Sequence, residues 1–153
     1  MVKQLPTGGS DIRFTAGLDK LVVALPGTKT IQRWDLKTFQ REASMTIDLL
    51  DPKTILQVAM GSASEGPLFV ATNPGGRATL SVLELKTLQP LPIELAMPQS
   101  IVFDRFMQLR ASAAGSVLGM WNPGAEPSGL QICVGKGLKL ESVLQQQCQP
   151  CCI

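Results

Sequence analysis

Apolar and polar residues alternate in short runs along most of this chain, and Gly, Pro, Asn and Asp separate the runs. Ile12 and Phe14 alternate with polar neighbours, which is the period-2 pattern of a half-buried strand. The run LVVAL at 21–25 is continuously apolar, as expected for a strand covered on both faces. The runs predicted to form strands are 11–15, 19–25, 30–36, 41–47, 55–61, 66–72, 78–85, 91–97, 106–112, 115–121, 129–135 and 139–143.

These strand patterns repeat with a long period. The stretch WDLKTFQ at 34–40 is echoed by LELKTLQ at 83–89, 49 residues later. LVVA at 21–24 is echoed by LFVA at 68–71, 47 residues later, and VLGM at 117–120 follows after another 49. A repeat of roughly 40–50 residues, with four strands in each unit, is typical of β-propeller blades.

The predicted fold class is therefore all-β, with antiparallel four-stranded blades of a partial β-propeller. We expect an N-terminal extension at 1–10, a partial propeller at 11–143 and an irregular, Cys-rich tail at 144–153. The three blades are expected at about 11–50, 54–98 and 104–143.

The first unit, DKLVVAL…TIQRWDLKTF, resembles bacterial WD-repeat-type β-propellers, and the resemblance covers about residues 11–143. Trp34 and Asp35 stand where the WD dipeptide ends the third strand of a blade. The second and third units have Leu83-Glu84 and Val134-Gly135 near that position, so the strict signature occurs only in the first unit. The resemblance implies a cytoplasmic scaffold, in some cases appended to a serine/threonine kinase domain.

The amino-acid composition reduces the number of possible functions. The 153 residues carry a net charge of +2, with no run of like charges and only 5% aromatic residues, so we expect no nucleic-acid partner. Histidine is absent, which removes His-based catalysis and metal ligation and predicts that the chain is not an enzyme. No apolar run approaches the ~20 residues that span a bilayer, and no signal sequence is evident, so a cytoplasmic location without membrane contact is predicted.

Two motifs have both a functional and a structural interpretation. Trp34-Asp35 could contact a partner at the rim, but Trp packing between blades and Asp capping the next turn is favoured. Cys148 and Cys151 form a C-x-x-C that is followed by Cys152. A redox site needs a following helix and a zinc site needs four ligands, for which only Cys133 remains. Incidental cysteines in a tail are therefore favoured over a zinc site or a labile disulfide.

A third stretch, GLQICVGKG at 129–137, has five residues between Gly129 and Gly135, where a phosphate-binding loop needs four, so a β-hairpin is predicted.

Acidic residues in turns could in principle bind calcium or magnesium, but solvated turn acids are favoured; these are Asp11, Asp19, Glu65 and Asp104. The repeat-equivalent acids Asp35 and Glu84 are attributed to capping. No catalytic, cofactor-binding or metal residue is predicted, and no cofactor.

Three blades are fewer than the four to eight that close a propeller, so both end faces need a cover. Further blades of a longer protein, a second copy that completes a six-bladed ring, or a different chain could supply it. The predicted function is a non-enzymatic protein-interaction scaffold that is a fragment or accessory part of a larger protein, with an unknown protein partner. The alternatives are a propeller enzyme or ligand- or metal-binding module with a carboxylate-lined channel, and a remnant without independent function.

Overall fold

The fold is all-β. The computed structural model describes residues 11–46, 55–72, 79–95, 107–122, 129–136 and 139–147. They form twelve strands in three sheets, with one 3-10 turn at Pro26–Thr28. Every predicted strand run overlaps an observed strand, so the pattern of apolar and polar residues located the strands correctly.

Apart from β8, strands adjacent in the chain are neighbours within each sheet, and they are joined in antiparallel pairs. The first sheet contains β1 (Arg13–Ala16), β2 (Lys20–Leu25), β3 (Thr30–Asp35) and β4 (Arg41–Thr46). The second contains β5 (Ile55–Ala59), β6 (Pro67–Thr72) and β7 (Thr79–Glu84). The third contains β8 (Glu94–Leu95), β9 (Gln108–Ala111), β10 (Val117–Asn122), β11 (Gly129–Lys136) and β12 (Lys139–Gln147), in the order β8-β12-β11-β10-β9.

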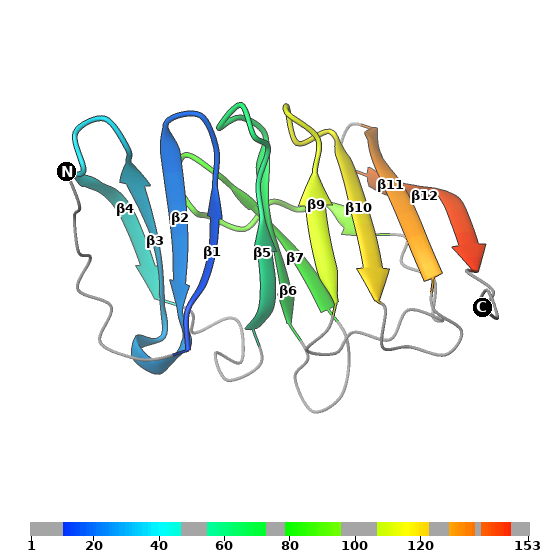
Figure 1. Cartoon of the computed structure of the whole chain (residues 1–153), viewed down its shortest axis with the longest axis horizontal. Helices are drawn as coiled ribbons and strands as arrows, with labels where there is room; N and C mark the ends of the chain where they lie inside the picture. The colour runs from blue at the N-terminus through cyan, green and yellow to red at the C-terminus, as the bar shows by residue number, and fades with distance from the viewer. Residues whose placement is uncertain are drawn as a thin grey trace, which may run out of the picture.

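The three sheets stand in a row with their leading strands together. β5 contacts β1 on one side and β9 on the other. In Figure 1 these three strands lie in the middle, the second sheet runs back from them, and the outer two sheets spread to either side. The leading strands thus lie side by side, as expected of successive antiparallel blades.

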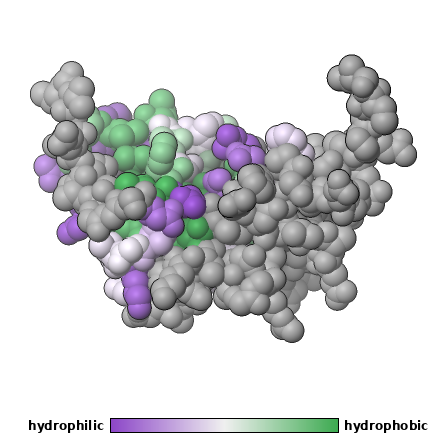
Figure 2. Space-filling view, turned by 60° about the horizontal axis from the view of Figure 1, so that its bottom comes forward, coloured by the Kyte–Doolittle hydropathy of each residue, from purple (hydrophilic) through white to green (hydrophobic). Residues whose placement is uncertain are grey.

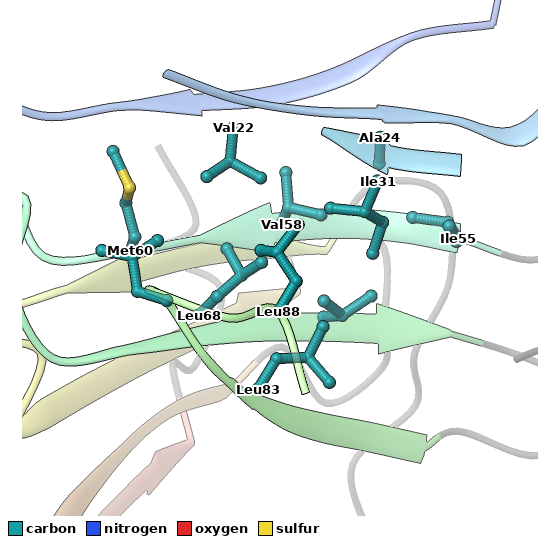
Figure 3. Close-up of a cluster of buried hydrophobic side chains, with 11 residues drawn as sticks. Val22, Ala24, Ile31, Ile55, Val58, Met60, Leu68, Leu83 and Leu88 are labelled. Atoms are coloured by element: carbon teal, nitrogen blue, oxygen red, sulfur yellow. The ribbon is translucent and has the colours of Figure 1, made fainter. Parts of the chain in front are cut away.

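Two hydrophobic cores cover the two faces of the second sheet. Leu68 and Val70 of β6 belong to the core shared with the first sheet, which Figure 3 shows. Phe69 and Ala71 alternate with them and belong to the core shared with the third sheet. All four side chains are at most 1% exposed, so this continuously apolar strand is buried on both faces. Burying one large apolar side chain contributes about 1.5–3 kcal/mol, and these cores hold the row together.

The turn after the third strand of a unit repeats its backbone hydrogen bonds. In the first unit, the N–H of Asp35 donates to the carbonyl of Gln40 at 2.9 Å, and the N–H of Phe39 donates to the carbonyl of Asp35 at 2.8 Å. Residues 84, 88 and 89 make the same two bonds 49 residues later, both at 2.8 Å. Phe39 and its counterpart Leu88 both have left-handed backbones, with φ of 57° and 62°. The 49-residue repeat is therefore structural.

Turns at one edge tie neighbouring sheets together directly. The N–H of Leu18 donates to the carbonyl of Ser62 at 2.8 Å, and the N–H of Ala63 donates to the carbonyl of Ala113 at 3.1 Å. The backbones approach so closely that a Cβ on Gly61 would lie 2.2 Å from the Ala113 oxygen. Glycine is needed here because there is no room for a side chain between the second and third sheets.

The second sheet has three strands, where four were predicted. After β7 the chain follows that strand only briefly, with the Leu91 N–H donating to the Val82 carbonyl at 2.8 Å. Pro92 has no N–H, and the Ile93 N–H turns back to the Leu91 carbonyl at 2.8 Å, so the ladder stops. The predicted fourth strand, β8, instead pairs in parallel with β12 of the third sheet.

The last strand also extends beyond its predicted end. β12 runs to Gln147, whereas an irregular tail was predicted from residue 144. Residues 144–147 continue the antiparallel pairing with β11 past a bulge at Ile132/Cys133, which satisfies the backbone polar groups that face β11. Residues 1–10 and 148–153 lie outside the described residues.

Candidate functional site

A polar groove lies between the first and second sheets. Its volume is about 510 Å³, and we call it the junction groove. Lys20, Arg33 and Glu42 line it from the first sheet, and two turns of the second sheet, 64–66 and 84–86, form the other wall. Polar side chains thus occupy this part of a junction whose remainder is an apolar core.

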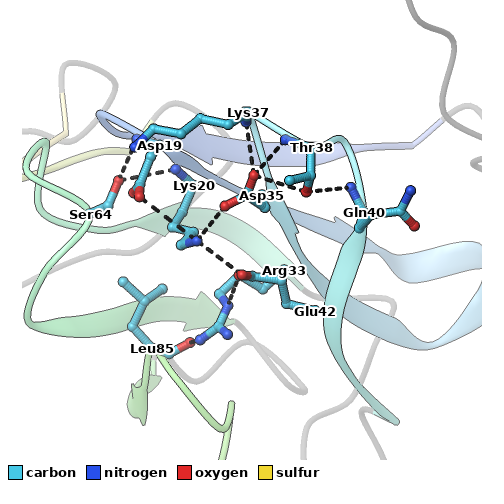
Figure 4. Close-up of polar contacts among 10 residues, drawn as sticks. All are labelled: Asp19, Lys20, Arg33, Asp35, Lys37, Thr38, Gln40, Glu42, Ser64 and Leu85. Carbon is cyan, nitrogen blue, oxygen red and sulfur yellow. Dashed lines mark hydrogen bonds and ion pairs between the residues drawn. The ribbon is translucent and has the colours of Figure 1, made fainter.

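An ion-pair network fixes the wall formed by the first sheet (Figure 4). Lys20 Nζ lies 2.7 Å from Asp35 Oδ2 and 3.0 Å from Glu42 Oε1. Arg33 Nε lies 3.0 Å from Glu42 Oε2, and its Nη1 donates to the Leu85 carbonyl of the second sheet at 2.8 Å. The Arg33 side chain is only 12% exposed, so this guanidinium joins the two sheets with little competition from water.

The network stabilises the charged forms of its central pair. The hydrogen bond from Lys20 lowers the pKa of Asp35, and the backbone N–H of Thr38 lowers it further. The same bond to Asp35, followed by the bond to Glu42, raises the pKa of Lys20. Both groups therefore stay ionised over the whole neutral range, and neither is suited to accept or release a proton in catalysis at neutral pH.

Ser64 connects the groove to the first sheet. Its Oγ accepts hydrogen bonds from the backbone N–H groups of Asp19 and Lys20, at 3.0 and 3.1 Å. Its backbone is left-handed, with φ of 61°, which is unusual for serine. Gly17 permits the approach, because a Cβ there would lie 2.6 Å from Ser64 Oγ. The 64–66 turn is therefore held in place against the first sheet.

The two residues of the predicted Trp-Asp motif have different roles in the structure. Asp35 caps the following turn as expected, because its Oδ1 accepts from the N–H groups of Lys37 and Thr38 at 2.9 and 2.7 Å. Trp34 is half-buried and its indole donates to Gln32 Oε1 at 3.2 Å. It belongs to neither core cluster of the described residues, so its packing between blades stays a prediction.

The other candidate residues do not come together. Asp11 pairs with Arg13 at 2.5 Å, Asp19 lies 3.8 Å from Lys20, and Glu65 lines the junction groove. Within the described ranges, no three His, Cys, Asp or Glu residues are placed to hold a metal ion. Asp104 lies outside those ranges.

The described residues also cover part of the other two motifs. Gly129–Lys136 is strand β11, antiparallel to β12, so the hairpin prediction is confirmed. Cys133 sits in this strand opposite Ser142, whereas the tail residues Cys148, Cys151 and Cys152 are not among those described.

Five polar residues of the groove were not predicted from the sequence: Lys20, Arg33, Glu42, Ser64 and Lys86. A signal was present in the repeat, because the charges of the first unit could have been compared with the residues 47 or 49 positions later. No helix in the described part of the chain is both long and apolar enough to cross a membrane.

Comparison with known proteins gives a limited result. No protein-family model matches the sequence, and no curated protein matches it. One similar solved structure, from Bacteroides uniformis, is described as "a putative 6-phosphogluconolactonase". The identity is 13% and the TM-score is 0.48, over 90% of this chain. This chain spans 42% of that one.

The comparison corrects one prediction. The absence of histidine predicted that this chain is not an enzyme, but the similar structure is described as an enzyme. Composition is too coarse a ground for that exclusion, because carboxylates, lysine and arginine can also take part in catalysis. The identity is too low for any activity to be carried over to this chain.

Proposed function

We propose that this chain is a segment of a WD-repeat-type β-propeller that binds other protein chains through the two end faces of its row of sheets. The repeated turn after β3 and β7 supports the repeat architecture, and the packing of β5 between β1 and β9 supports the blade arrangement. The proposal depends above all on the exposed apolar side chains at the two ends of the row.

At the first end, Phe14 is 68% exposed. Phe14 lies opposite Val23 in the β1–β2 register, whereas the neighbouring Val22 faces the core shared with the second sheet. Phe14 therefore points to the face turned away from the row. In Figure 2, apolar residues gather on the side of the molecule that holds the first sheet, with hydrophilic residues around them.

At the other end, Trp121 is 44% exposed. It alternates with Met120, which is buried against the second sheet, so Trp121 faces away from the row as well. A propeller closes with four to eight blades, and each blade covers the apolar face of the next. Two copies of three sheets would close a six-bladed ring, with the end face of one copy against that of the other.

Light scattering after size-exclusion chromatography tests this proposal. The expected mass is about twice 16.4 kDa, and Phe14→Lys is expected to shift it toward 16.4 kDa. Lys37→Glu, in an exposed turn, is the control and should leave the mass unchanged. A wild-type monomer at high concentration that also shows no binding of an apolar dye would contradict association through these faces. A monomer that binds the dye strongly would favour cover by a different chain.

A further inference from the structure

The repeat supplies an internal comparison for the junction groove. The charged residues that line the groove from the first sheet are Lys20, Arg33 and Glu42. Their counterparts 47 or 49 residues later are all apolar: Pro67, Val82 and Leu91. These counterparts face the junction between the second and third sheets. Val82 and Leu91 pack in or against its core, and a Cβ on Gly115 would lie 2.9 Å from the Pro67 ring.

The comparison shows that the fold does not require charge at these positions. The second junction packs the same positions with apolar side chains. The ion pairs of the first junction are partly buried, with side chains 12–30% exposed, so each charge loses part of its hydration, a cost that apolar packing avoids. Beyond the Arg33 bond to the Leu85 carbonyl, the polar wall of the first junction therefore has no evident advantage for stability, and a binding role would account for it.

Several groups in the groove have bonding capacity left. Lys86 and Glu65 are exposed, and neither makes a hydrogen bond or ion pair through its side chain to another described residue. Ser64 Oγ accepts two hydrogen bonds, but within the described chain its own proton has no acceptor. The groove thus offers one cation, the carboxylate of Glu65, that of Glu84, which among the described residues accepts only from the Thr87 hydroxyl, and one hydroxyl donor beside a wall whose charges are already paired.

These groups identify the kind of ligand. A phosphate-like anion would be repelled by the carboxylates of Glu42, Glu65 and Glu84. A metal cation would be repelled by the ammonium and guanidinium groups on the same walls. A peptide segment with both an acidic and a basic side chain matches both signs. We propose that the junction groove binds such a segment of a partner protein, with the acidic side chain on Lys86 and the basic one on Glu65.

This inference rests on the proposed protein-binding function but uses a surface separate from the end faces. Capped tripeptides provide the probes: Lys-Ala-Glu, Lys-Ala-Lys and Glu-Ala-Glu. Each would be titrated into the isotope-labelled protein, with the backbone amide NMR signals of Ser64, Glu65 and Lys86 as the readout. Lys86→Glu is the test variant. Lys37→Glu is the matched control, because Lys37 occupies the same place in the turn 49 residues earlier and does not line the groove.

The expected result is that Lys-Ala-Glu shifts the groove signals at lower concentration than either like-charged peptide. Lys86→Glu should weaken its binding roughly tenfold, the loss expected for one charge-assisted hydrogen bond, whereas Lys37→Glu should not. Equal shifts with all three peptides, no shifts at all, or unchanged binding to Lys86→Glu would overturn the inference. A protein that dimerises through its end faces yet binds no peptide would refute this inference alone, because the dimer mass does not depend on the groove.

Discussion

Gly61→Ala tests whether the second and third sheets approach as closely as the structure shows. The new Cβ would lie 2.2 Å from the Ala113 oxygen, 2.7 Å from the Glu65 oxygen and 2.9 Å from the Gly115 nitrogen. All three are backbone atoms, so no side chain can rotate away. The Ala113 and Gly115 atoms belong to the turn of the third sheet, which must move away, and the Glu65 oxygen belongs to the same turn as Gly61, which must also deform. Overpacking typically costs about 1–3 kcal/mol, and a backbone-to-backbone clash belongs at the upper end, about 3 kcal/mol.

Gly27→Ala is the matched control, because no heavy atom lies within 4 Å of a Cβ at Gly27. Neither glycine has a positive φ, so the two variants differ in packing and not in backbone strain. Urea unfolding should place the Gly61→Ala midpoint about 1.5 M below wild type, for a slope of about 2 kcal/mol per molar. Gly27→Ala should leave the midpoint unchanged or raise it slightly. A loss below about 1 kcal/mol for Gly61→Ala, or equal losses for both, would refute the close contact of these turns.

Three further expectations concern stability. Leu68→Ala and Phe69→Ala each create a cavity in one of the two cores. In urea unfolding, Leu68→Ala should lower the free energy of unfolding by about 2–5 kcal/mol and Phe69→Ala by about 3–5 kcal/mol. A loss under about 1 kcal/mol for either variant would contradict the packing of that core. Because the pKa of Asp35 is lowered in the folded state, its pairing stabilises the protein above pH ~4, the unfolded-state value, and this contribution is lost as the pH falls further. Thermal melts should thus show Asp35→Asn with a weaker dependence on pH below 4 than wild type, and parallel curves would contradict the pairing. Arg33→Ala should cost about 1–3 kcal/mol because the Leu85 carbonyl loses its donor, and Arg33→Lys should restore only part of this, since lysine lacks the second N–H group.

The strands could be predicted from the sequence because their signal is local. Alternation marks β1 and β4, and a continuous apolar run marks β6, whichever sheet lies next to them. The position of β8 could not be predicted in this way. Its residues have strand character, but the choice of neighbour depended on where Pro92 ended the ladder with β7. The end of β12 was missed for a related reason, because glutamines carry little strand signal and the pairing with β11 extends the strand.

The junction groove was missed because its residues come from distant parts of the chain. Lys20 and Glu42 are separated by a whole hairpin, and Lys86 belongs to the next sheet. Each alone has the appearance of an ordinary surface charge. The Asp35 cap, by contrast, was predictable, since its partners at 37 and 38 are its near neighbours in sequence.

In a repeat architecture each unit contacts only its neighbours, so a junction can change without disturbing the next one. In this chain β6 keeps the two junctions apart, because Leu68 and Phe69 face opposite cores. The second junction retains apolar packing where the first carries Arg33 and its ion pairs. The stability supplied by the apolar second junction would let the first junction carry polar groups that packing alone does not favour. A binding site between sheets is therefore expected where the repeat departs from its own apolar pattern, and the comparison of one unit with the next identifies that place.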